Sequence, residues 1–263
     1  MDLQLDGDTA LVTASSSGLG KAAATALARE GTDVLINGRD EDRLEAAQTE
    51  IEAVATGAVI AEPGDLTEPN DIERLVETAV DRFGGLDHLV TSAGGPPSGP
   101  FLEIEEADWY ETYDLLVMSV VRLVQEAAEH LRADGGGSIV TITSRSVKEA
   151  IDSLVLSNAV RMSVIGLEKT LSLELAPEVR ANAVLPGAHE TARIRELVEQ
   201  AVERGEYDSY EAGLEERGSG NPLGRIGDPM ELGNTVAFLC SPLAGYINGE
   251  TIVIDGGDHA SNL

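Results

Sequence analysis

Short apolar runs alternate with amphipathic stretches from one end of the chain to the other. Apolar runs bounded by turn residues are typical of buried strands, and apolar residues spaced by three and four are typical of helices. When strands alternate with helices, right-handed crossovers make the strands parallel and place helices on both faces of the sheet. The pattern predicts strands at 9–13, 33–37, 58–61, 86–91, 138–143, 179–185 and 251–254 and helices at 18–30, 40–54, 68–83, 108–131, 153–175 and 228–240.

We therefore predict an α/β fold, a Rossmann-type doubly wound parallel sheet of about seven strands with helices on both faces. No Pro/Ser-rich linker or change of composition divides the 263 residues, so residues 1–263 are expected to form a single domain. The charged stretch at about 190–220 resembles a mobile segment, and we expect it to cap a substrate site.

The balance of charge is strongly acidic. Asp and Glu outnumber Lys and Arg by 47 to 18, which gives a formal net charge of -29 at pH 7. The carboxylates are scattered along polar helix faces, and 42% of the residues are hydrophobic, so the composition does not indicate disorder. Such a surface repels itself in dilute buffer and is screened by salt. We therefore predict a protein from a salt-accumulating halophile, and we expect no nucleic-acid partner because phosphates would be repelled.

The N-terminus and the lone cysteine bear on the cellular compartment. Residues 1–6 lack the basic start and apolar core of a secretion signal. No uninterrupted apolar stretch approaches the length of a bilayer, so we expect a cytoplasmic protein with no membrane association. Cys240 excludes an internal disulfide, and we interpret it as a small buried hydrophobe.

A serine-rich turn with two glycines follows the first predicted strand and opens the first predicted helix. Gly18 and Gly20 let the backbone approach a pyrophosphate, and the helix N-terminus supplies oriented N–H donors. Ala14 stands where the first glycine of such a turn is usual, and a plain tight turn is the alternative interpretation. We expect the turn to cradle a dinucleotide through Thr13, Ser15, Ser16, Ser17, Gly18, Leu19 and Gly20.

The segment 13–20 resembles the Thr-Gly-x3-Gly-x-Gly motif of the short-chain dehydrogenases/reductases, and further markers of that family follow in order. Near the C-terminus, Pro222–Ile226, Asn248-Gly249 and Asp255–Gly257 resemble the family's signature. The subgroup that the chain most resembles is the 3-oxoacyl-carrier-protein reductase-like one. The resemblance implies further cofactor contacts from Asp65 and Leu66 at the adenine, from Ser92, Ala93 and Gly94 beside the sheet, and from Pro186, Gly187 and Thr191 at the nicotinamide amide.

The same resemblance implies an activity and an assembly. Members of the family transfer a hydride between a nicotinamide cofactor and a small carbonyl or alcohol substrate. The resemblance also implies a homo-oligomer, a tetramer or a dimer, formed through the helices at 108–131 and 153–175 and the C-terminal strand.

The end of the second predicted strand bears on the choice of cofactor. NAD-selective sites usually place an acidic residue there to accept the adenosine ribose hydroxyls. Here Asn37 and Gly38 carry no carboxylate, and Arg39 follows. A guanidinium from Arg39, with Arg43 as a second candidate, suits a 2′-phosphate, so NADP(H) is favoured over NAD(H). An exposed arginine that merely opens a helix is the alternative.

The expected catalytic side chains are largely replaced. In the family, a serine after the fifth strand precedes Tyr-x-x-x-Lys on the next helix, and an upstream asparagine anchors a water relay. Ser144 occupies the serine position, but an ungapped count puts Ser157 at the tyrosine, Arg161 at the lysine and Leu116 at the asparagine. A serine hydroxyl is a poor acid near neutrality. Arg161 can hold the ribose or stabilise an alkoxide, but it does not release a proton.

Two other side chains are candidate proton donors. Lys148 lies on the loop beyond the fifth strand, and His189 follows the sixth strand in Pro186-Gly-Ala-His189. A desolvated lysine or a loop histidine can donate a proton near neutral pH, although a solvated loop charge and a bystander histidine are the plain alternatives. No metal site is expected, because the four histidines are scattered without ligand spacing.

Two functions fit these residues. The first is an NADP(H)-dependent oxidoreductase in which Ser144 orients a carbonyl, Arg161 holds the ribose, and Lys148 or His189 donates the proton. The second is a cofactor-binding protein without turnover, a sensor or a structural partner. Both predict nucleotide binding, so only turnover separates them.

Overall fold

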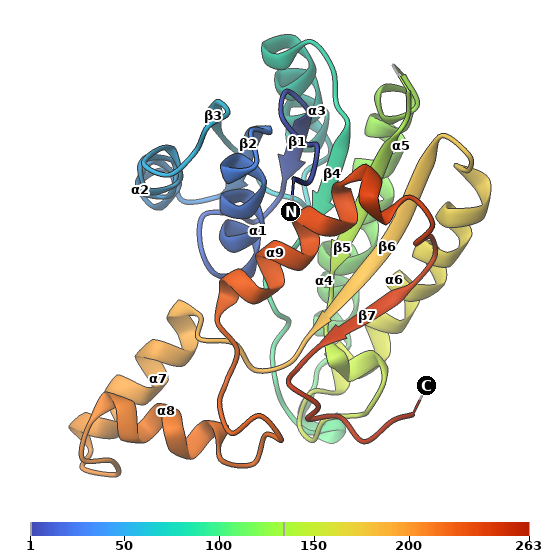
Figure 1. The fold of residues 1–263 in the computed structure, drawn as a ribbon. Helices are drawn as coiled ribbons and strands as arrows, with labels where there is room; N and C mark the ends of the chain where they lie inside the picture. Colours follow the sequence, from blue (N-terminus) through green and yellow to red (C-terminus); the bar gives the residue numbers. More distant parts are fainter. Residues whose placement is uncertain (1, 134, 263) are drawn as a thin grey trace.

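The computed structural model describes residues 2–133 and 135–262 and contains one seven-stranded sheet (Figure 1). All six strand pairings are parallel, and the order is β3-β2-β1-β4-β5-β6-β7. This confirms the predicted Rossmann-type α/β fold. The strands are β1 (Thr9–Val12), β2 (Asp33–Gly38), β3 (Val59–Pro63), β4 (His88–Thr91), β5 (Gly137–Ile142), β6 (Val179–Pro186) and β7 (Thr251–Ile254).

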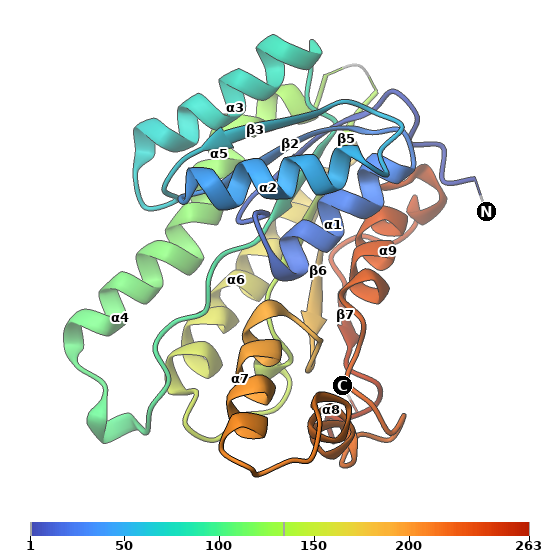
Figure 2. The same ribbon diagram turned by 90° about the vertical axis from the view of Figure 1, so that its left-hand side faces the viewer.

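Helices cover both faces of the sheet, as Figure 2 shows from the side. One buried cluster joins the sheet to α1, α2 and α9, and a second cluster joins the opposite face to α3, α5 and α6. The helices are α1 (Gly18–Arg29), α2 (Glu41–Glu52), α3 (Pro69–Phe83), α4 (Glu106–Tyr113), α5 (Ser119–Leu131), α6 (Val155–Glu174), α7 (Ala192–Glu203), α8 (Tyr210–Gly218) and α9 (Pro229–Cys240).

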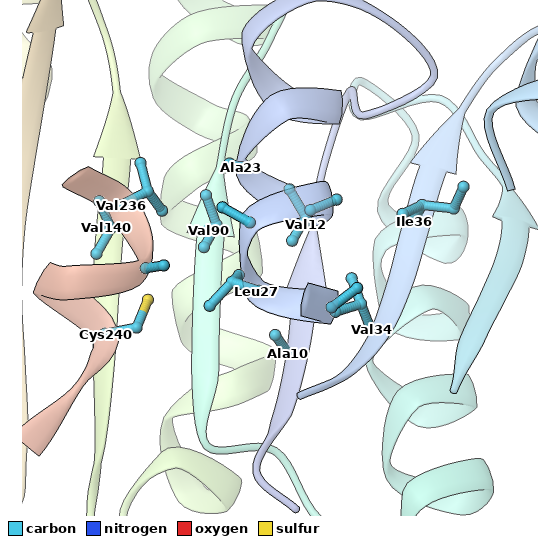
Figure 3. Close-up of a cluster of buried hydrophobic side chains, with 14 of the residues drawn as sticks. Ala10, Val12, Ala23, Leu27, Val34, Ile36, Val90, Val140, Val236 and Cys240 are labelled. Carbon is cyan, nitrogen blue, oxygen red and sulfur yellow. The ribbon is translucent and has the colours of Figure 1, made fainter. Parts of the chain in front are cut away.

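Close packing of α1 on α9 fixes the turn at the start of α1. The inner face of α1 consists largely of alanines and Leu27, and these residues are buried against β1 and β4 (Figure 3). A Cβ on Gly233 of α9 would lie 2.4 Å from the carbonyl oxygen of Ala22, so only glycine permits this approach. The sole cysteine, Cys240, ends α9 within the same cluster and is 2% exposed.

The chain reverses its direction of winding between β1 and β4. The crossovers from β1 lead to β2 and β3 on one side, and the later strands lie on the other side. In doubly wound sheets a crevice forms at this switch point, outside the carboxyl ends of the strands. The turn after β1 and the loop after β4 therefore meet at one site.

Two elements differ from the sequence prediction. The helix expected over 108–131 contains a π-helical segment, η2 (Asp114–Met118), which separates α4 from α5. A π-turn inserts an extra residue into the helix and is common near functional sites. The charged stretch at about 190–220, for which no helix was predicted, contains α7 and α8, which lie beyond the carboxyl ends of the strands (Figures 1 and 2). Across 2–133 and 135–262, the structure has no helix that is both long and apolar enough to span a bilayer.

Candidate cofactor and active site

A cavity of about 820 Å³ opens at the carboxyl ends of the strands, at the switch point. This volume lies in the range typical of small-molecule and cofactor sites. The turn after β1, the end of β2, the loop after β3, the loop after β4 and the end of β5 all contribute to it. The lining residues are Ala14, Ser16, Ser17, Leu19, Gly20, Asn37, Gly38, Arg39, Asp40, Arg43, Gly64, Asp65, Leu66, Ser92, Ala93, Gly94, Leu115, Ile142, Thr143 and Arg161.

The turn after β1 brings the backbone close to this cofactor pocket. A Cβ on Gly20 would lie 2.5 Å from the carbonyl oxygen of Ala14, so glycine is required where α1 leaves the turn. Thr13 ties the turn to the loop after β4, because its hydroxyl donates to Ser92 O at 2.8 Å and accepts from Ser92 N at 2.9 Å. Ser15 is fully buried and donates to Val12 O at 2.6 Å, so it braces the turn.

Ala14 adopts a left-handed conformation, with φ of 46°. This region costs a residue with a Cβ about 1–2 kcal/mol. It explains why glycine is usual at this position, and it marks a strained point beside the cofactor pocket.

Replacing Ala14 with glycine should stabilise the protein by about 0.5–1 kcal/mol, since the relief of strain exceeds the extra chain entropy of glycine. The free energy of unfolding from chemical denaturation measures the effect. The matched control is Ala10→Gly in β1, where no strain is relieved and stability should fall. Loss of stability in Ala14→Gly would contradict the strained turn.

Two arginines lie at the end of the cofactor pocket formed by β2 and α2. Asp40 caps α2 by accepting from Arg43 N at 2.9 Å, and this cap places Arg39 and Arg43 on either side of the helix start. Arg39 is 78% exposed at its side chain and lies 3.6 Å from a carboxylate oxygen of Asp65. Arg43 lies 3.8 Å from a carboxylate oxygen of Asp40, so each cation has a carboxylate partner. Both guanidinium groups line the pocket with Ser16 of the facing turn, where they suit a bound anion.

Asp65 is held rigidly at the rim. Burial alone would raise the pKa of its carboxyl, but hydrogen bonds from the backbone and hydroxyl of Thr67, with the charge of Arg39, lower the pKa overall. Asn37 forms a second brace. Its side-chain amide donates to Gly64 O at 3.1 Å, and its side-chain oxygen accepts from Ala14 N at 3.3 Å. The ends of β1, β2 and β3 are thereby joined at the mouth of the pocket.

Arg161 of α6 lies at the other end of the cofactor pocket. Its side chain is 8% exposed, and its Nε finds no hydrogen-bond partner among the residues of 2–133 and 135–262. Burial lowers the pKa of the guanidinium to about 10, so it stays charged at neutral pH. A buried and unpaired cation is costly, which indicates a position adapted to a polar or anionic ligand.

Ser144 and Ser157, which stand at the family's serine and tyrosine positions, both form hydrogen bonds with Ser146. Ser144 caps η3 (Arg145–Val147), since its hydroxyl accepts from Ser146 N at 3.1 Å. The Ser146 hydroxyl lies 3.0 Å from the hydroxyl of Ser157. Ser157 is 6% exposed, and neither it nor Ser144 lines the cofactor pocket. The sequence pattern did not predict that Ser146 would link these two serines.

Neither candidate proton donor lines the cofactor pocket. Lys148 follows η3 at its C-terminal end, is half-buried, and does not line the pocket. His189 is 4% exposed, with its Nδ1 3.1 Å from Gly187 O. It lines a separate cavity of about 210 Å³ together with Arg225, Glu231 and Asp255.

The segment after β6 lies beside the cofactor pocket without lining it. Pro186 is buried at the end of β6, and Gly187 packs against Asp255, which a Cβ would meet at 2.5 Å. Thr191 lies near Gly18 and lines a neighbouring cavity with it. Helix α8 is joined to this segment, since the Tyr210 hydroxyl donates to Glu190 at 2.7 Å.

The pocket fits a dinucleotide in its polar groups as well as its size. A close-backbone turn at a helix N-terminus suits a pyrophosphate, and the two arginines near β2 suit a further phosphate. At the far end, the buried Nε of Arg161 offers an unsatisfied donor beside Thr143 and Leu115. The spacing of these features along one cavity suits an elongated ligand with anionic groups at one end and in the middle.

Known proteins share both the sequence pattern and this fold. The family described as Enoyl-(Acyl carrier protein) reductase matches residues 13–259. The chain is 34% identical to dehydrogenase/reductase SDR family member 4 of Bos taurus, over 96% of this chain and 88% of that protein. It is also 34% identical to an L-rhamnose 1-dehydrogenase (NAD(P)(+)) of Sphingomonas, over 96% of each chain.

A solved structure extends the likeness to three dimensions. L-sorbose reductase from Gluconobacter frateurii, solved in complex with NADPH and L-sorbose, aligns with a TM-score of 0.93 and 30% identity, covering 99% of this chain and 100% of that one. The matched residues run from the turn after β1 to the loop after β7 and so include every strand but β1. The chain belongs to the short-chain dehydrogenase/reductase family of oxidoreductases.

Proposed function

We propose that the protein is an NADP(H)-dependent oxidoreductase that interconverts a small carbonyl compound and its alcohol with a rebuilt proton-donor arrangement. The observation that carries the proposal is the cofactor pocket itself, which has arginines at one end and a buried, unpaired Arg161 at the other. When bound, the nicotinamide cofactor would supply the hydride, and the protein would supply binding, orientation and charge.

The residues of the pocket divide this work between them. The turn 13–20 would hold the pyrophosphate, and Asp65, Leu66 and 92–94 would contact the adenosine half. Arg161 would donate to the ribose and stabilise negative charge that develops on the substrate oxygen. Pro186, Gly187 and Thr191 lie at the strand end where the nicotinamide amide would be held.

The proton donor is not the side chain at the tyrosine position. Ser157 is buried against Ser146, and its hydroxyl is a poor acid near neutral pH. Lys148 and His189 stay candidates only if the cap moves, because both lie outside the pocket that Arg161 lines. The Ser144 hydroxyl would orient the carbonyl once a substrate displaces it from Ser146 N.

Turnover separates this function from nucleotide binding alone. NADPH oxidation is to be followed at molar KCl with ketones, aldehydes, ketose and aldose sugars and an oxoacyl thioester. At least one substrate should be reduced at a rate proportional to enzyme. NADPH binding without turnover of any class would favour a sensor or structural protein instead.

The preference for NADP(H) over NAD(H) rests on Arg39, Arg43 and Ser16 near the end of β2. The NADPH bound in the sorbose reductase structure supports a site of this kind, whereas the similar 7α-hydroxysteroid dehydrogenase was solved with NADH.

Replacing Arg39 with glutamine should raise the Kd for NADPH about 10–100-fold, the value of one or two charge-assisted hydrogen bonds. The Kd for NADH should change little. Glutamine avoids placing a second carboxylate beside Asp65. Fluorescence titration measures both, and Arg82→Gln, on the exposed last turn of α3, controls for net charge. An equal rise in the Kd for NADPH and for NADH would contradict a role for Arg39 in recognition of the 2′-phosphate.

The acidic surface supports a salt-accumulating halophile and a cytoplasmic protein, because only high internal salt would screen a net charge of -29. Exposed apolar side chains support a homo-oligomer, a tetramer or a dimer. They lie on α4 and α6 and near β7, at Tyr110, Tyr113, Met162, Leu173, Leu243 and Tyr246.

A further inference from the structure

A carboxyl group is buried beneath the cofactor pocket, and the function proposed above leaves it unused. Glu168 of α6 is 2% exposed. Its Oε1 accepts a hydrogen bond from the Thr141 hydroxyl of β5, and its Oε2 finds no partner within 2–133 and 135–262. Thr141 in turn accepts from the Thr91 hydroxyl of β4 at 2.8 Å. An ionised carboxylate at such a position opposes folding, so the group has to be neutral or serve a purpose.

Burial keeps the carboxyl of Glu168 protonated at neutral pH. Burial raises its pKa to about 8, and the hydrogen bond from Thr141 offsets only part of that rise. The group therefore holds a proton at neutral pH and releases it under mildly alkaline conditions. Few buried groups of a protein titrate in this range, and those that do are candidates for proton chemistry.

Charged side chains on the surrounding elements have other partners. Arg122 of α5 pairs with Asp114 at 2.7 Å, and Arg180 of β6 donates to backbone carbonyls at the end of α9. Lys169, the next residue on α6, donates to Gly249 O at 3.1 Å. On the face of α6 that carries Glu168, the nearest charged side chain is Arg161, seven residues earlier and about two turns away.

Thr141 lines a small cavity that borders the cofactor pocket. The volume of this cavity, about 10 Å³, has room for about one water molecule. Its polar lining includes Thr141, Ser119 and Arg161, and Leu116 of the π-helical segment forms part of its wall. Five residues line both this cavity and the cofactor pocket, namely Ser92, Ala93, Ile142, Thr143 and Arg161.

We propose that Glu168 is the proton reservoir of the active site and exchanges a proton with the Arg161 end of the cofactor pocket through the Thr141 hydroxyl and a water molecule in the small cavity. The inference rests on the proposed function. A hydroxyl and a carboxylic acid can exchange donor and acceptor roles, so the contact between Thr141 and Glu168 can run in either direction.

The proton balance in the reductive direction is simple. The hydride brings the two electrons to the carbonyl carbon, and the carbonyl oxygen takes a proton from the cavity water. That water takes a proton from Thr141, and Thr141 takes one from Glu168, whose O–H bond breaks. Glu168 is left as a carboxylate until solvent returns a proton. Glu168 is thus a positioning residue for the proton and does not touch the substrate.

Infrared spectroscopy tests the reservoir without relying on turnover. The wild-type protein should show the C=O stretch of a protonated carboxylic acid that disappears between about pH 7 and 9. Glu168→Gln should lack this band, whether or not NADPH is added. Thr141→Val should keep it. A wild-type protein with no carboxyl group titrating in this range would overturn the proposal.

Steady-state kinetics test the proton path. For the wild type, kcat of reduction should fall as pH rises through the pKa of Glu168. Glu168→Gln and Thr141→Val should lower kcat about 10-fold or more at neutral pH and abolish that alkaline decline. Thr112→Val removes a different buried hydroxyl, on α4, which has no hydrogen-bond partner among the described residues and lines neither cavity, and it should keep the wild-type profile.

The outcomes distinguish the two proposals. If Glu168→Gln is folded, binds NADPH and keeps the alkaline decline, Glu168 does not supply the proton. If the wild type reduces none of the carbonyl classes, the proposed function fails, whereas the infrared titration still reports whether Glu168 holds the proton. Thermal unfolding of each variant shows that a lost activity is not a lost fold.

Discussion

Replacing Arg161 with methionine should lower kcat about 10²–10³-fold and at the same time make the protein more stable. The loss follows from removing a preorganised donor at the place where charge develops on the substrate oxygen. The gain follows because the guanidinium is 8% exposed and its Nε has no partner among the described residues. Replacing even a buried ion pair by apolar side chains of similar volume is often neutral or stabilising by about 1–4 kcal/mol, and a charge without a partner has no attraction to lose.

The matched control is Arg180→Met on β6. Arg180 is also partly buried, but its guanidinium donates to the carbonyl oxygens of Leu239, Cys240 and Ser241 at 2.8, 3.1 and 3.1 Å. Its removal should reduce stability, because three buried acceptors lose a donor, and should leave kcat nearly unchanged. Urea unfolding and NADPH oxidation measure the two effects. If Arg161→Met were less stable than the wild type, Arg161 would be paired in solution and the cost assigned to its burial would be wrong.

Transfer from molar KCl to dilute buffer should lower the melting temperature on the order of 10 °C, since the self-repulsion of a net charge of -29 amounts to several kcal/mol when unscreened. At 1 M salt the Debye length is about 3 Å, so the repulsion is confined to touching charges. Calorimetry across a KCl series measures the effect.

A neutral osmolyte provides the control for the salt series. Sucrose strengthens apolar burial without screening charge, so it should restore much less stability than KCl at equal osmolality. Recovery with sucrose as complete as with KCl would point to weak packing rather than to charge repulsion. Full stability in dilute buffer would remove the physical basis for a halophilic origin.

The fold could be predicted from the sequence because its signals are local and repeat along the chain. Each strand is a short apolar run, and each turn at a strand end carries its own glycines or polar residues. Much of the lining of the large pocket was also predictable, because it follows strands that the topology brings to one edge of the sheet. These segments are the turn 13–20, Arg39, Asp65, Leu66 and 92–94. The order of the markers along the chain then indicated the family.

The chemistry beside Arg161 was less predictable because it depends on side-chain direction. The sequence places Ser157 one helical turn from Arg161 but does not show that its hydroxyl bonds to Ser146. His189 follows the correct strand, yet its ring is directed to a second cavity. Periodicity held a usable signal for Glu168, which is spaced by four from Val164 and by seven from Arg161 on the buried face of α6. A count of buried positions along that helix would have revealed the carboxyl.

The prediction of one uninterrupted helix over 108–131 was wrong. Its apolar pattern continues through Asp114–Met118, so nothing in the periodicity signals an interruption. In the structure, Leu116 and Val117 of this segment pack with Val160 and Val164 of α6, a tertiary contact that the local pattern does not show. The two helices of the cap were missed for a different reason, because their charged faces hide a weak apolar stripe.

The burial of Cys240 gives the protein a built-in reporter of its own unfolding. Burial raises the pKa of this thiol to about 12, so almost no thiolate is present in the native state near neutral pH. It is the only cysteine of the chain, and it lies where α9 meets the sheet (Figure 3). A thiol-reactive dye should therefore label the protein only when α9 detaches. The rate of labelling would give the opening kinetics in each salt solution without any engineered probe.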